Sequence, residues 1–325
     1  MRCRWFCPLV ALLVLFLLAL SSCEDGVSLK PRSSGKPYDV VVVANDARVR
    51  TILSKMVETP LPGLPQQENA FDVSHAADAT ALRSSRYARA IVVVDIDASR
   101  HSATRLRYEK DVYALPQMIV HLETPSADSL IADHDRVGRS LRALLGRFET
   151  NAALRYLRKS HSPAREKEVL TTVDCRILVP SDLVKTKSGR RFIWLSDDGS
   201  TTMRNICVYS APGTDVSVER LTALRDSVMR ANIKGETDAM YMTTERRIAP
   251  TVKTIRVGRR TIVEMRGLWQ MEGDIMGGPF VSHTIVDTLR GRTITAEAFV
   301  YAPGEEKRNI IKRMEAALYT LSLSR

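Results

Sequence analysis

The chain has 325 residues, of which 44% are hydrophobic and 26% are charged, and its formal net charge is +11 at pH 7. This composition is that of an ordinary globular protein, and it excludes a wholly disordered or collagen-like chain. Five cysteines are too few for a scaffold built on disulfides. The length suits one large domain or two of ordinary size.

The first residues have the pattern of a secretory signal. Two arginines precede an apolar run from Phe6 to Leu20, which is shorter than the roughly 20 residues of a spanning helix. The run ends in Leu20-Ser-Ser-Cys23, which resembles the bacterial lipobox, where the cysteine is lipidated after cleavage. We expect residues 1–22 to be a signal peptide and Cys23 to carry a lipid anchor. The alternative is an ordinary secretory signal with an incidental cysteine.

Residues 23–37 follow as a lipidated amino terminus and a tether. Glu24 and Asp25 come directly after the cysteine, and the stretch from Gly26 to Pro37 is rich in Gly, Ser, Lys and Pro. Such a composition favours a flexible chain over a packed element. The body is therefore expected to stand a short distance from the membrane.

Residues 38–160 are predicted to form an α/β subdomain. Its pattern includes apolar runs that suit buried strands, a Pro- and Gly-rich loop, and a long amphipathic helix that opens at Pro125-Ser126. A break at Ser160–Pro163 marks the predicted boundary. The predicted strands are 38–44, 71–74, 90–96, 104–111 and 117–122, with the last two as a hairpin, and a further helix is predicted to end near Glu58.

Residues 161–325 are predicted to form a second subdomain of two βββα units. Each unit has three strand-like runs, then a Val-Tyr-(Ser)-Ala-Pro-Gly turn, then a helix with one apolar face. The repeat suggests a duplication, although Pro-Gly after a strand is also common turn chemistry. The predicted fold class is α+β, with mixed or antiparallel sheets and helices packed on them. The predicted strands are 169–179, 191–195, 204–209, 261–271, 279–289 and 293–301.

No common catalytic or cofactor motif is present. The chain lacks a GxGxxG loop, a Walker A loop, a GxSxG elbow and an HExxH helix, and the histidines are scattered. We therefore expect no cofactor and no metal. Two weak candidates remain: His75, near Asp72 and Ser74, and His283, four residues before Asp287 on a predicted strand.

The densest unusual stretch runs from Arg266 to Phe280 and forms a predicted hairpin rich in glycine, methionine and aromatic residues. Adjacent glycines let a backbone take positive φ or approach another surface closely. The stretch either forms a recognition patch or fills the core beneath a sheet. The residues of the possible binding surface are Arg266, Trp269, Met276, Gly277, Gly278, Phe280 and, from upstream, His75.

The excess of basic residues is spread through the chain, without the clustered stripe or known module that nucleic-acid binding needs. Export also argues against a nucleic-acid partner. Attraction to anionic lipid head groups is physically reasonable, and a solvated basic surface is the plainer interpretation. Cys175 and Cys207 lie in the body and could pair as a disulfide in an oxidising envelope, or stay as buried thiols.

Several motifs together resemble the DUF4837 family of envelope lipoproteins from Bacteroidetes-type bacteria. They are Gly63-Leu-Pro65, Ser74-His75, Tyr113-Ala-Leu-Pro-Gln117, Phe192-Ile-Trp194, Gly267-Leu-Trp269, Met276-Gly-Gly-Pro-Phe280, Phe299-Val-Tyr-Ala-Pro303, Lys307-Arg308 and Glu315-Ala-Ala-Leu-Tyr319. The resemblance covers nearly the whole chain from about Lys36. It implies a lipid anchor at Cys23 and no assigned activity or catalytic residue, and acidic residues after such a cysteine are associated with surface export.

These observations predict a lipid-anchored protein of the cell envelope, on either side of the outer membrane. A binding or scaffold role is favoured over an enzyme, because no catalytic constellation is evident. The alternatives are an envelope hydrolase of unfamiliar type, with His75 or His283 as its base, and a solute- or lipid-binding lipoprotein. The expected partners are the membrane through the anchor, other envelope proteins or anionic lipids, and no nucleic acid.

Overall fold

The structure is a computed structural model of the whole chain, and it describes residues 30–77 and 79–324. The predicted signal peptide, residues 1–22, and Cys23 lie outside the described residues. Within the described part of the chain, every helix is too short or too polar to cross a membrane.

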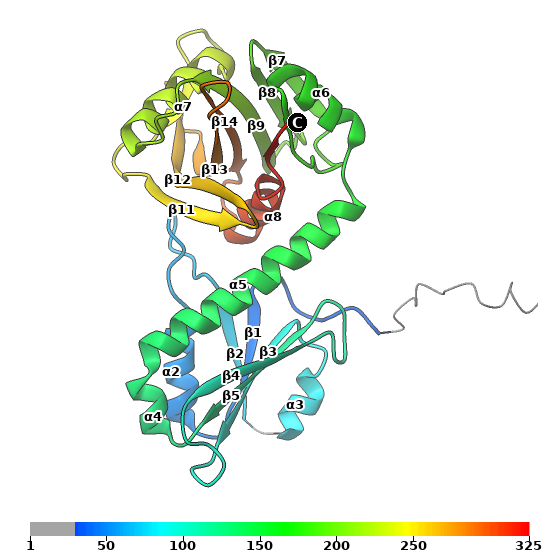
Figure 1. Ribbon diagram of the computed structural model, residues 1–325, viewed down its shortest axis with the longest axis vertical. Helices are drawn as coiled ribbons and strands as arrows, with labels where there is room; N and C mark the ends of the chain where they lie inside the picture. The colour runs from blue at the N-terminus through cyan, green and yellow to red at the C-terminus, as the bar shows by residue number, and fades with distance from the viewer. Residues whose placement is uncertain (1–29, 78, 325) are drawn as a thin grey trace, which may run out of the picture.

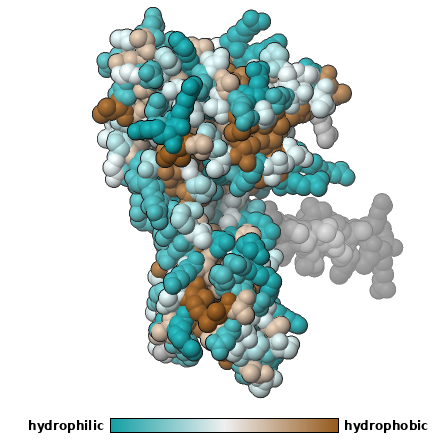
Figure 2. Space-filling view, turned by 90° about the vertical axis from the view of Figure 1, so that its left-hand side faces the viewer, coloured by the Kyte–Doolittle hydropathy of each residue, from teal (hydrophilic) through white to brown (hydrophobic). Residues whose placement is uncertain are grey.

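The described residues form two lobes stacked end to end, and the long helix α5 (His134–Lys159) runs diagonally between them (Figure 1). Figure 2 shows one face of the molecule, on which the two lobes meet at a narrower waist. Hydrophilic side chains cover most of this face, and hydrophobic ones gather in patches on both lobes.

The amino-terminal lobe is built on a five-stranded mixed sheet with the order β2-β1-β3-β5-β4, in which only the edge strand β4 is antiparallel. Val40 and Val42 face one cluster of apolar side chains and Val43 faces another, so β1 is buried on both sides. The strands are β1 (Asp39–Val43), β2 (Asp72–Ala76), β3 (Ala90–Ile96), β4 (Arg105–Lys110) and β5 (Met118–Thr124).

Helices cover both faces of this sheet. On one face lie α2 (Ala47–Val57), α4 (Ala127–Ala132) and α5, and on the other lies the short α3 (Ala79–Ser85). The predicted hairpin and the buried strands are confirmed. The predicted long helix is found as two helices, α4 and α5, which break at Asp133, and α3 was missed. Seven residues are too few for helical periodicity to show in the sequence.

The carboxy-terminal lobe is built on an eight-stranded antiparallel sheet with the order β10-β12-β13-β14-β9-β8-β7, and β11 also pairs with β12. A two-stranded ladder joins β6 (Cys175–Arg176) to β15 (Ser322–Leu323). The sheet strands are β7 (Lys185–Gly189), β8 (Phe192–Ser196), β9 (Met203–Pro212), β10 (Tyr241–Thr244), β11 (Thr251–Val257), β12 (Arg260–Glu272), β13 (Gly277–Asp287) and β14 (Arg292–Tyr301). The predicted α+β class is confirmed.

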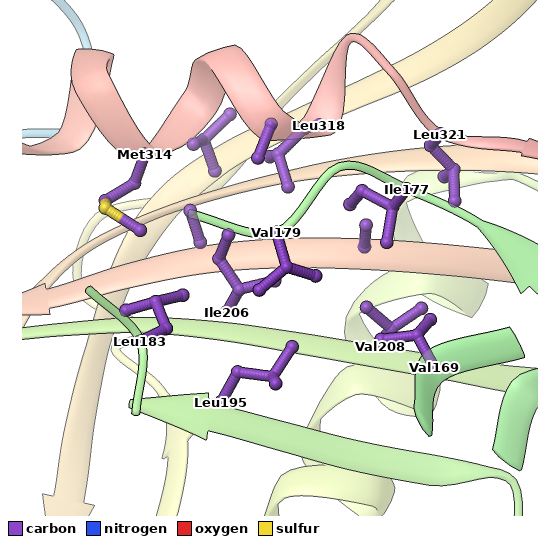
Figure 3. Close-up of a cluster of buried hydrophobic side chains, with 14 of the residues drawn as sticks. Val169, Ile177, Val179, Leu183, Leu195, Ile206, Val208, Met314, Leu318 and Leu321 are labelled. Carbon is purple, nitrogen blue, oxygen red and sulfur yellow. The ribbon is translucent and has the colours of Figure 1, made fainter. Parts of the chain in front are cut away.

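The two faces of the large sheet carry separate apolar cores. Helix α7 (Val218–Asn232) covers one face, and α6 (Pro163–Val173) with α8 (Arg308–Leu318) covers the other. Figure 3 shows the second core, where Met314 and Leu318 of α8 point toward side chains of the sheet and of the segment before it. Each side chain here is almost fully buried.

The two predicted βββα units are found only in part. The strand predicted at 169–179 is wrong: residues 163–173 form helix α6, whose Val169 and Val173 are buried at helical spacing, and only Cys175–Arg176 form a strand, β6. Strands β7, β8 and β9 precede α7, whereas the five strands from β10 to β14 precede α8. The last strands of the two units, β9 and β14, pair antiparallel, which is the relation that a two-fold axis normal to the sheet produces. Such an axis would place both helices on one face, whereas α7 and α8 lie on opposite faces. The repeat therefore extends over the strands and stops at the helices.

The opposite faces also separate the two cysteines. Cys175 lies in the core beside α8, Cys207 lies in the core beside α7, and both are free thiols. The possible disulfide between them is therefore wrong. Burial raises the pKa of Cys175 to about 12, so its thiol stays protonated.

A loop of residues 59–70, here called the reaching loop, leaves the amino-terminal lobe and extends to the other lobe (Figure 1). There Glu68 accepts hydrogen bonds of 2.8 Å from the backbone N–H groups of both Lys307 and Arg308. These groups open α8, whose own first residues provide no side-chain cap. One lobe therefore caps the last helix of the other.

We predict that Glu68→Ala lowers the free energy of unfolding by about 1–2 kcal/mol, because two N–H groups of α8 lose their acceptor. Urea unfolding followed by circular dichroism measures the loss. Glu306→Ala is the matched control, since Glu306 is an exposed acid at the same helix start. Equal effects of the two substitutions would contradict the capping role of Glu68.

Candidate functional site

The aromatic residues of the predicted recognition hairpin lie in the core. Trp269 is buried, donates a 3.1 Å hydrogen bond to the carbonyl of Val300 and packs edge-on against Phe299. Phe280 is buried beneath the guanidinium of Arg225, whose Cζ lies 4.0 Å from the ring centroid. Of the two sequence-based alternatives, core filling therefore holds for Trp269 and Phe280.

The paired glycines of this hairpin have a structural explanation. A Cβ at Gly278 would lie 2.1 Å from the carbonyl oxygen of Val300, and one at Gly277 would lie 2.9 Å from that of Trp269. Only glycine permits so close an approach of strand to strand. Met276, next to them, is partly exposed at the hairpin end.

His75 does not join this hairpin. It lies on β2 of the other lobe, is exposed, and places its Nε2 3.1 Å from the hydroxyl of Ser54. The expected shared surface of His75 and the 266–280 hairpin is therefore not formed.

Arg266 is the centre of a buried ionic cluster between β12 and α8. Its Nε donates a 2.7 Å hydrogen bond to Glu264, and its Nη2 donates to Glu315. Lys312 Nζ lies 3.1 Å from the second oxygen of Glu315, and the Tyr319 hydroxyl donates to Glu315 at 3.0 Å. The sequence pattern pointed to Arg266 but not to its partners, which only strand and helix packing bring together.

His283 lies in the same cluster. It is fully buried, its Nε2 is 3.6 Å from a Glu264 oxygen, and its ring meets the Tyr319 ring edge-on at 4.8 Å. Within the described residues neither ring nitrogen has a hydrogen-bond partner. Asp287, the partner that strand spacing suggested, instead pairs with Arg292 at 3.0 Å.

The cluster keeps its carboxylates charged. Burial acts to raise the pKa of Glu315, but the charges of Arg266 and Lys312 outweigh it and leave that pKa at about 2. Burial also opposes ionisation of Glu264, yet Arg266 and His283 hold its pKa well below the usual range. The two carboxylates in turn raise the pKa of Arg266 against the effect of burial.

Glu264, His283 and Glu315 bring ligand atoms to within 4.8 Å of one another, as a metal site would. The residues present do not fit a divalent cation well. Arg266 already binds one oxygen of each carboxylate, and Lys312 lies against another oxygen of Glu315. Lys253 Nζ also lies 3.1 Å from Glu264, so three cations face the two carboxylates, and a buried metal would add uncompensated positive charge. We interpret the cluster as a structural ionic network.

A cleft of about 950 Å³ lies beside this cluster, between the two lobes. Both lobes, the segment before β1 and helix α5 line it, so it exists only where they meet. Lys312 belongs to both the cleft and the ionic cluster. The main residues that line the cleft are Arg32, Pro37, Tyr38, Arg89, Pro116, Glu149, Ala153, Tyr156, Asp182, Arg204, Ile310, Lys312 and Arg313.

Most charged side chains of the cleft are held by ion pairs. Arg89 and Glu149 form a bidentate ion pair with nitrogen-to-oxygen distances of 2.7–2.9 Å. Asp182 accepts hydrogen bonds from the guanidinium groups of Arg204 and Arg313 at 2.8 Å each. Such pairs fix the geometry of the walls before any ligand arrives. The walls combine these rigid polar groups with proline, alanine and aromatic surface.

Tyr38 lies where the cleft approaches the cluster, and its backbone is strained. Its φ is 73°, a value that a residue with a large side chain rarely adopts. The ring packs against Phe71, and the Arg308 guanidinium lies 5.6 Å from its centroid. Burial and the nearby charge of Glu315 raise the pKa of Tyr38 well above its usual range, so it faces the cleft as a neutral phenol.

We predict that Arg266→Met lowers the free energy of unfolding by about 3–5 kcal/mol at pH 7, because two buried carboxylates lose their partner. In the native chain, the lowered pKa of Glu315 stabilises the folded state at pH values above 4.5, the ordinary pKa of a glutamate. This stabilisation is lost as the pH falls toward 2. In the variant, burial is no longer opposed by Arg266, the largest of the charges that lower this pKa, so the pKa of Glu315 rises, acid protonates the group and the penalty is relieved.

The difference between the two proteins should therefore narrow as pH falls from 7 to 5, as urea unfolding at each pH would show. Arg256→Met, at an exposed arginine of the neighbouring strand β11, is the control and should change stability by less than about 0.5 kcal/mol. A pH-independent difference would refute the charge argument.

Two family models match the chain, and they meet at the end of α5. Residues 33–158 match a domain of unknown function, DUF8532, and residues 162–320 match another, DUF4837. The resemblance to DUF4837 is thus confirmed for the second half only. The motifs at Gly63–Pro65, Ser74-His75 and Tyr113–Gln117 lie in the part that DUF8532 matches, which corrects the expected extent.

No curated protein matches the chain. A crystal structure of a protein from Bacteroides thetaiotaomicron VPI-5482 at 1.50 Å resolution aligns with 14% identity and a TM-score of 0.25, over 47% of this chain and 46% of that one. The lipid transfer and protein localization domain of human StarD13 (DLC2) aligns with 7% identity and a TM-score of 0.18, over 47% of this chain and 94% of that domain. Scores this low carry no argument about fold or function. What the comparisons establish is that residues 162–320 match the model of DUF4837, a domain of unknown function.

Proposed function

We propose that this protein is a lipid-anchored protein of the cell envelope that binds a ligand in the cleft between its lobes. The observation that carries the proposal is the cleft itself, which needs side chains from both matched domains and from α5. Ligand sites occur preferentially at such junctions between domains. The volume of about 950 Å³ is at the upper end of the range that small-molecule sites occupy.

The chemistry of the walls indicates what kind of ligand fits. Pro37, Pro116, Ala153 and Ile310 give an apolar surface, while ion-paired arginines supply fixed N–H donors. Among the described residues the Arg32 side chain forms no ion pair, and it lines the cleft. An amphiphilic small molecule with an acceptor group would use both kinds of surface.

Placement in the envelope rests on the sequence. The apolar run that ends at Cys23 supports a signal peptide and a lipid anchor, and residues 23–37 would connect the anchor to the body. We propose attachment to the outer membrane, on its periplasmic side or at the cell surface. Other envelope proteins and anionic lipids are the proposed partners beyond the cleft ligand.

An envelope hydrolase is the second candidate function. It is favoured by His283, a buried imidazole beside Glu264 with no hydrogen-bond partner among the described residues. Unpartnered buried polar groups are rare and need an explanation. The same observation shows that no Ser, Thr or Cys side chain of the described residues hydrogen-bonds to His283, so ligand binding is the better supported of the two functions.

We predict that the fluorescent anionic amphiphile 1-anilinonaphthalene-8-sulfonate binds the native protein in the cleft, and that Ala153→Trp weakens this binding at least about tenfold. The indole would occupy the space beside α5 that the ligand needs. The matched control is Ala143→Trp, at an exposed position on the same helix. Fluorescence titration gives both affinities, and circular dichroism checks that each variant is folded. Equal affinity of Ala153→Trp and the native chain would refute the cleft as the binding site.

We also predict that Cys23→Ala abolishes lipid attachment. Mass spectrometry of the native protein should find a chain that begins at Cys23 and carries fatty acyl groups, because lipobox cysteines are lipidated and acylated. Cys175→Ala, which removes a buried thiol of the body, is the control and should leave membrane fractionation unchanged. A native chain with an unmodified Cys23 would contradict the anchor without bearing on the cleft.

A further inference from the structure

Lys312 is the point at which the ionic cluster meets the cleft. Its Nζ lies 3.1 Å from a Glu315 oxygen, its side chain keeps 20% of its surface exposed, and it lines the cleft. Within the described residues, Glu315 is the only ion-pair partner of Lys312. An ammonium group has three N–H donors and Glu315 occupies one of them, so donors remain for a ligand in the cleft.

The positive charge of Lys312 is not fully balanced inside the protein. Glu315 also accepts from Arg266, which pairs with Glu264 as well. Lys253 lies against Glu264, so the cluster sets three cations against two carboxylates. Burial lowers the pKa of Lys312 by more than the charge of Glu315 raises it. An anion in the cleft would supply the missing counter-charge.

The hydroxyl of Tyr38 is a second unused donor on the same cleft. Tyr38 is only 8% exposed, and its ring contacts Phe71 and the Arg308 guanidinium. Among residues 30–77 and 79–324, no hydrogen bond involves this hydroxyl. It is not one of the fully enclosed side-chain atoms that lack a partner, so it keeps accessible surface. Buried polar groups are rarely unpaired, and strained backbone such as that of Tyr38 is common where ligands bind.

The two donors lie at the same end of the cleft. Burial raises the pKa of Tyr38 and the charge of Glu315 raises it further, while the same charge acts on Lys312. A charge has such effects on groups near it, so both donors are close to Glu315. Glu149, which also acts on Tyr38, is already bound by Arg89. A ligand that enters this end therefore meets free O–H and N–H donors.

We propose that the cleft binds an amphiphilic organic anion, whose carboxylate or phosphate group accepts hydrogen bonds from Lys312 and Tyr38. The inference rests on the proposed function, because it names the head group of the cleft ligand. The apolar walls at Pro116 and Ala153 would contact the body of that ligand. An anion is selected over a neutral acceptor because it balances the charge of the cluster as well as pairing the two donors.

The test compares two fluorescent probes that share one aromatic skeleton. N-phenyl-1-naphthylamine is 1-anilinonaphthalene-8-sulfonate without the sulfonate, so the pair differs only in the anionic group. Both probes are titrated into the full chain, into Lys312→Met and into Tyr38→Phe. The matched control is Lys253→Met, which removes the same charge from the same cluster at a lysine outside the cleft lining. Titration of Ala153→Trp measures any binding outside the cleft.

We expect Lys312→Met to weaken binding of the sulfonate probe at least about tenfold, and Tyr38→Phe at least about threefold. The neutral probe should change less than about twofold in both variants, and Lys253→Met should change neither probe by more than about twofold. Equal weakening of both probes by Lys312→Met would mean a change in the shape of the cleft and would overturn the proposal. Circular dichroism checks that each variant is folded.

A second measurement on the native chain needs no variant. Dodecanoate or dodecyl phosphate should displace the sulfonate probe at a lower concentration than dodecan-1-ol, which has the same alkyl chain without the charge. The stronger of the two anions identifies the head group as carboxylate or phosphate. Displacement by dodecan-1-ol at an equal or lower concentration would refute the anionic head group.

Failure of this inference can be told apart from failure of the proposed function. If Ala153→Trp leaves binding of both probes unchanged, the cleft is not the site and both proposals fall. If Ala153→Trp weakens both probes but Lys312→Met leaves the sulfonate probe unaffected, the cleft binds its ligand without this head-group contact. Only the further inference is then wrong.

Discussion

The architecture depends on a single continuous helix that belongs to both lobes. The first part of α5 buries Val137, Leu141 and Leu145 in the core of the amino-terminal lobe, and Leu157 near its end enters the core of the other. Because an α-helix of 26 residues is stiff, the lobes are held at a set separation. The same helix also forms part of the cleft wall, through Ala153 and Tyr156. The family models also change at its end, at residues 158 and 162.

The ionic cluster at Arg266 adds directional contacts to this arrangement. Apolar packing alone would tolerate small shifts of α8 over the sheet. The hydrogen bonds from Arg266 to both Glu264 and Glu315 are directional, so they fix the position of α8 relative to β12. A second buried pair, Arg225 with Glu297, joins α7 to β14 on the opposite face at 2.9 Å. Such pairs contribute little net stability when formed, yet cost several kcal/mol when one partner is lost. Helices α7 and α8 are therefore each held in register by charge as well as by apolar contact.

Much of the fold could be predicted from local patterns, and the site could not. The strand from 38 to 44 and the helix after Pro125-Ser126 show in the sequence because their burial follows a simple period. Strands β10 and β11 were not predicted, because the alternation of buried and exposed residues along them is weak. Arg266 and Glu315 are 49 positions apart and meet only through tertiary packing. The available signal was a pair of charges, Glu264 and Arg266, inside an apolar strand, where charges are stable only when paired.

The cap that Glu68 provides for α8 couples the two ends of the chain in time as well as in space. Glu68 precedes Lys307 by 239 residues, so this cap forms only once nearly the whole chain is available. The last helix therefore completes its first turn against a lobe built from the opening part of the chain, and the packing of the second lobe depends on the first.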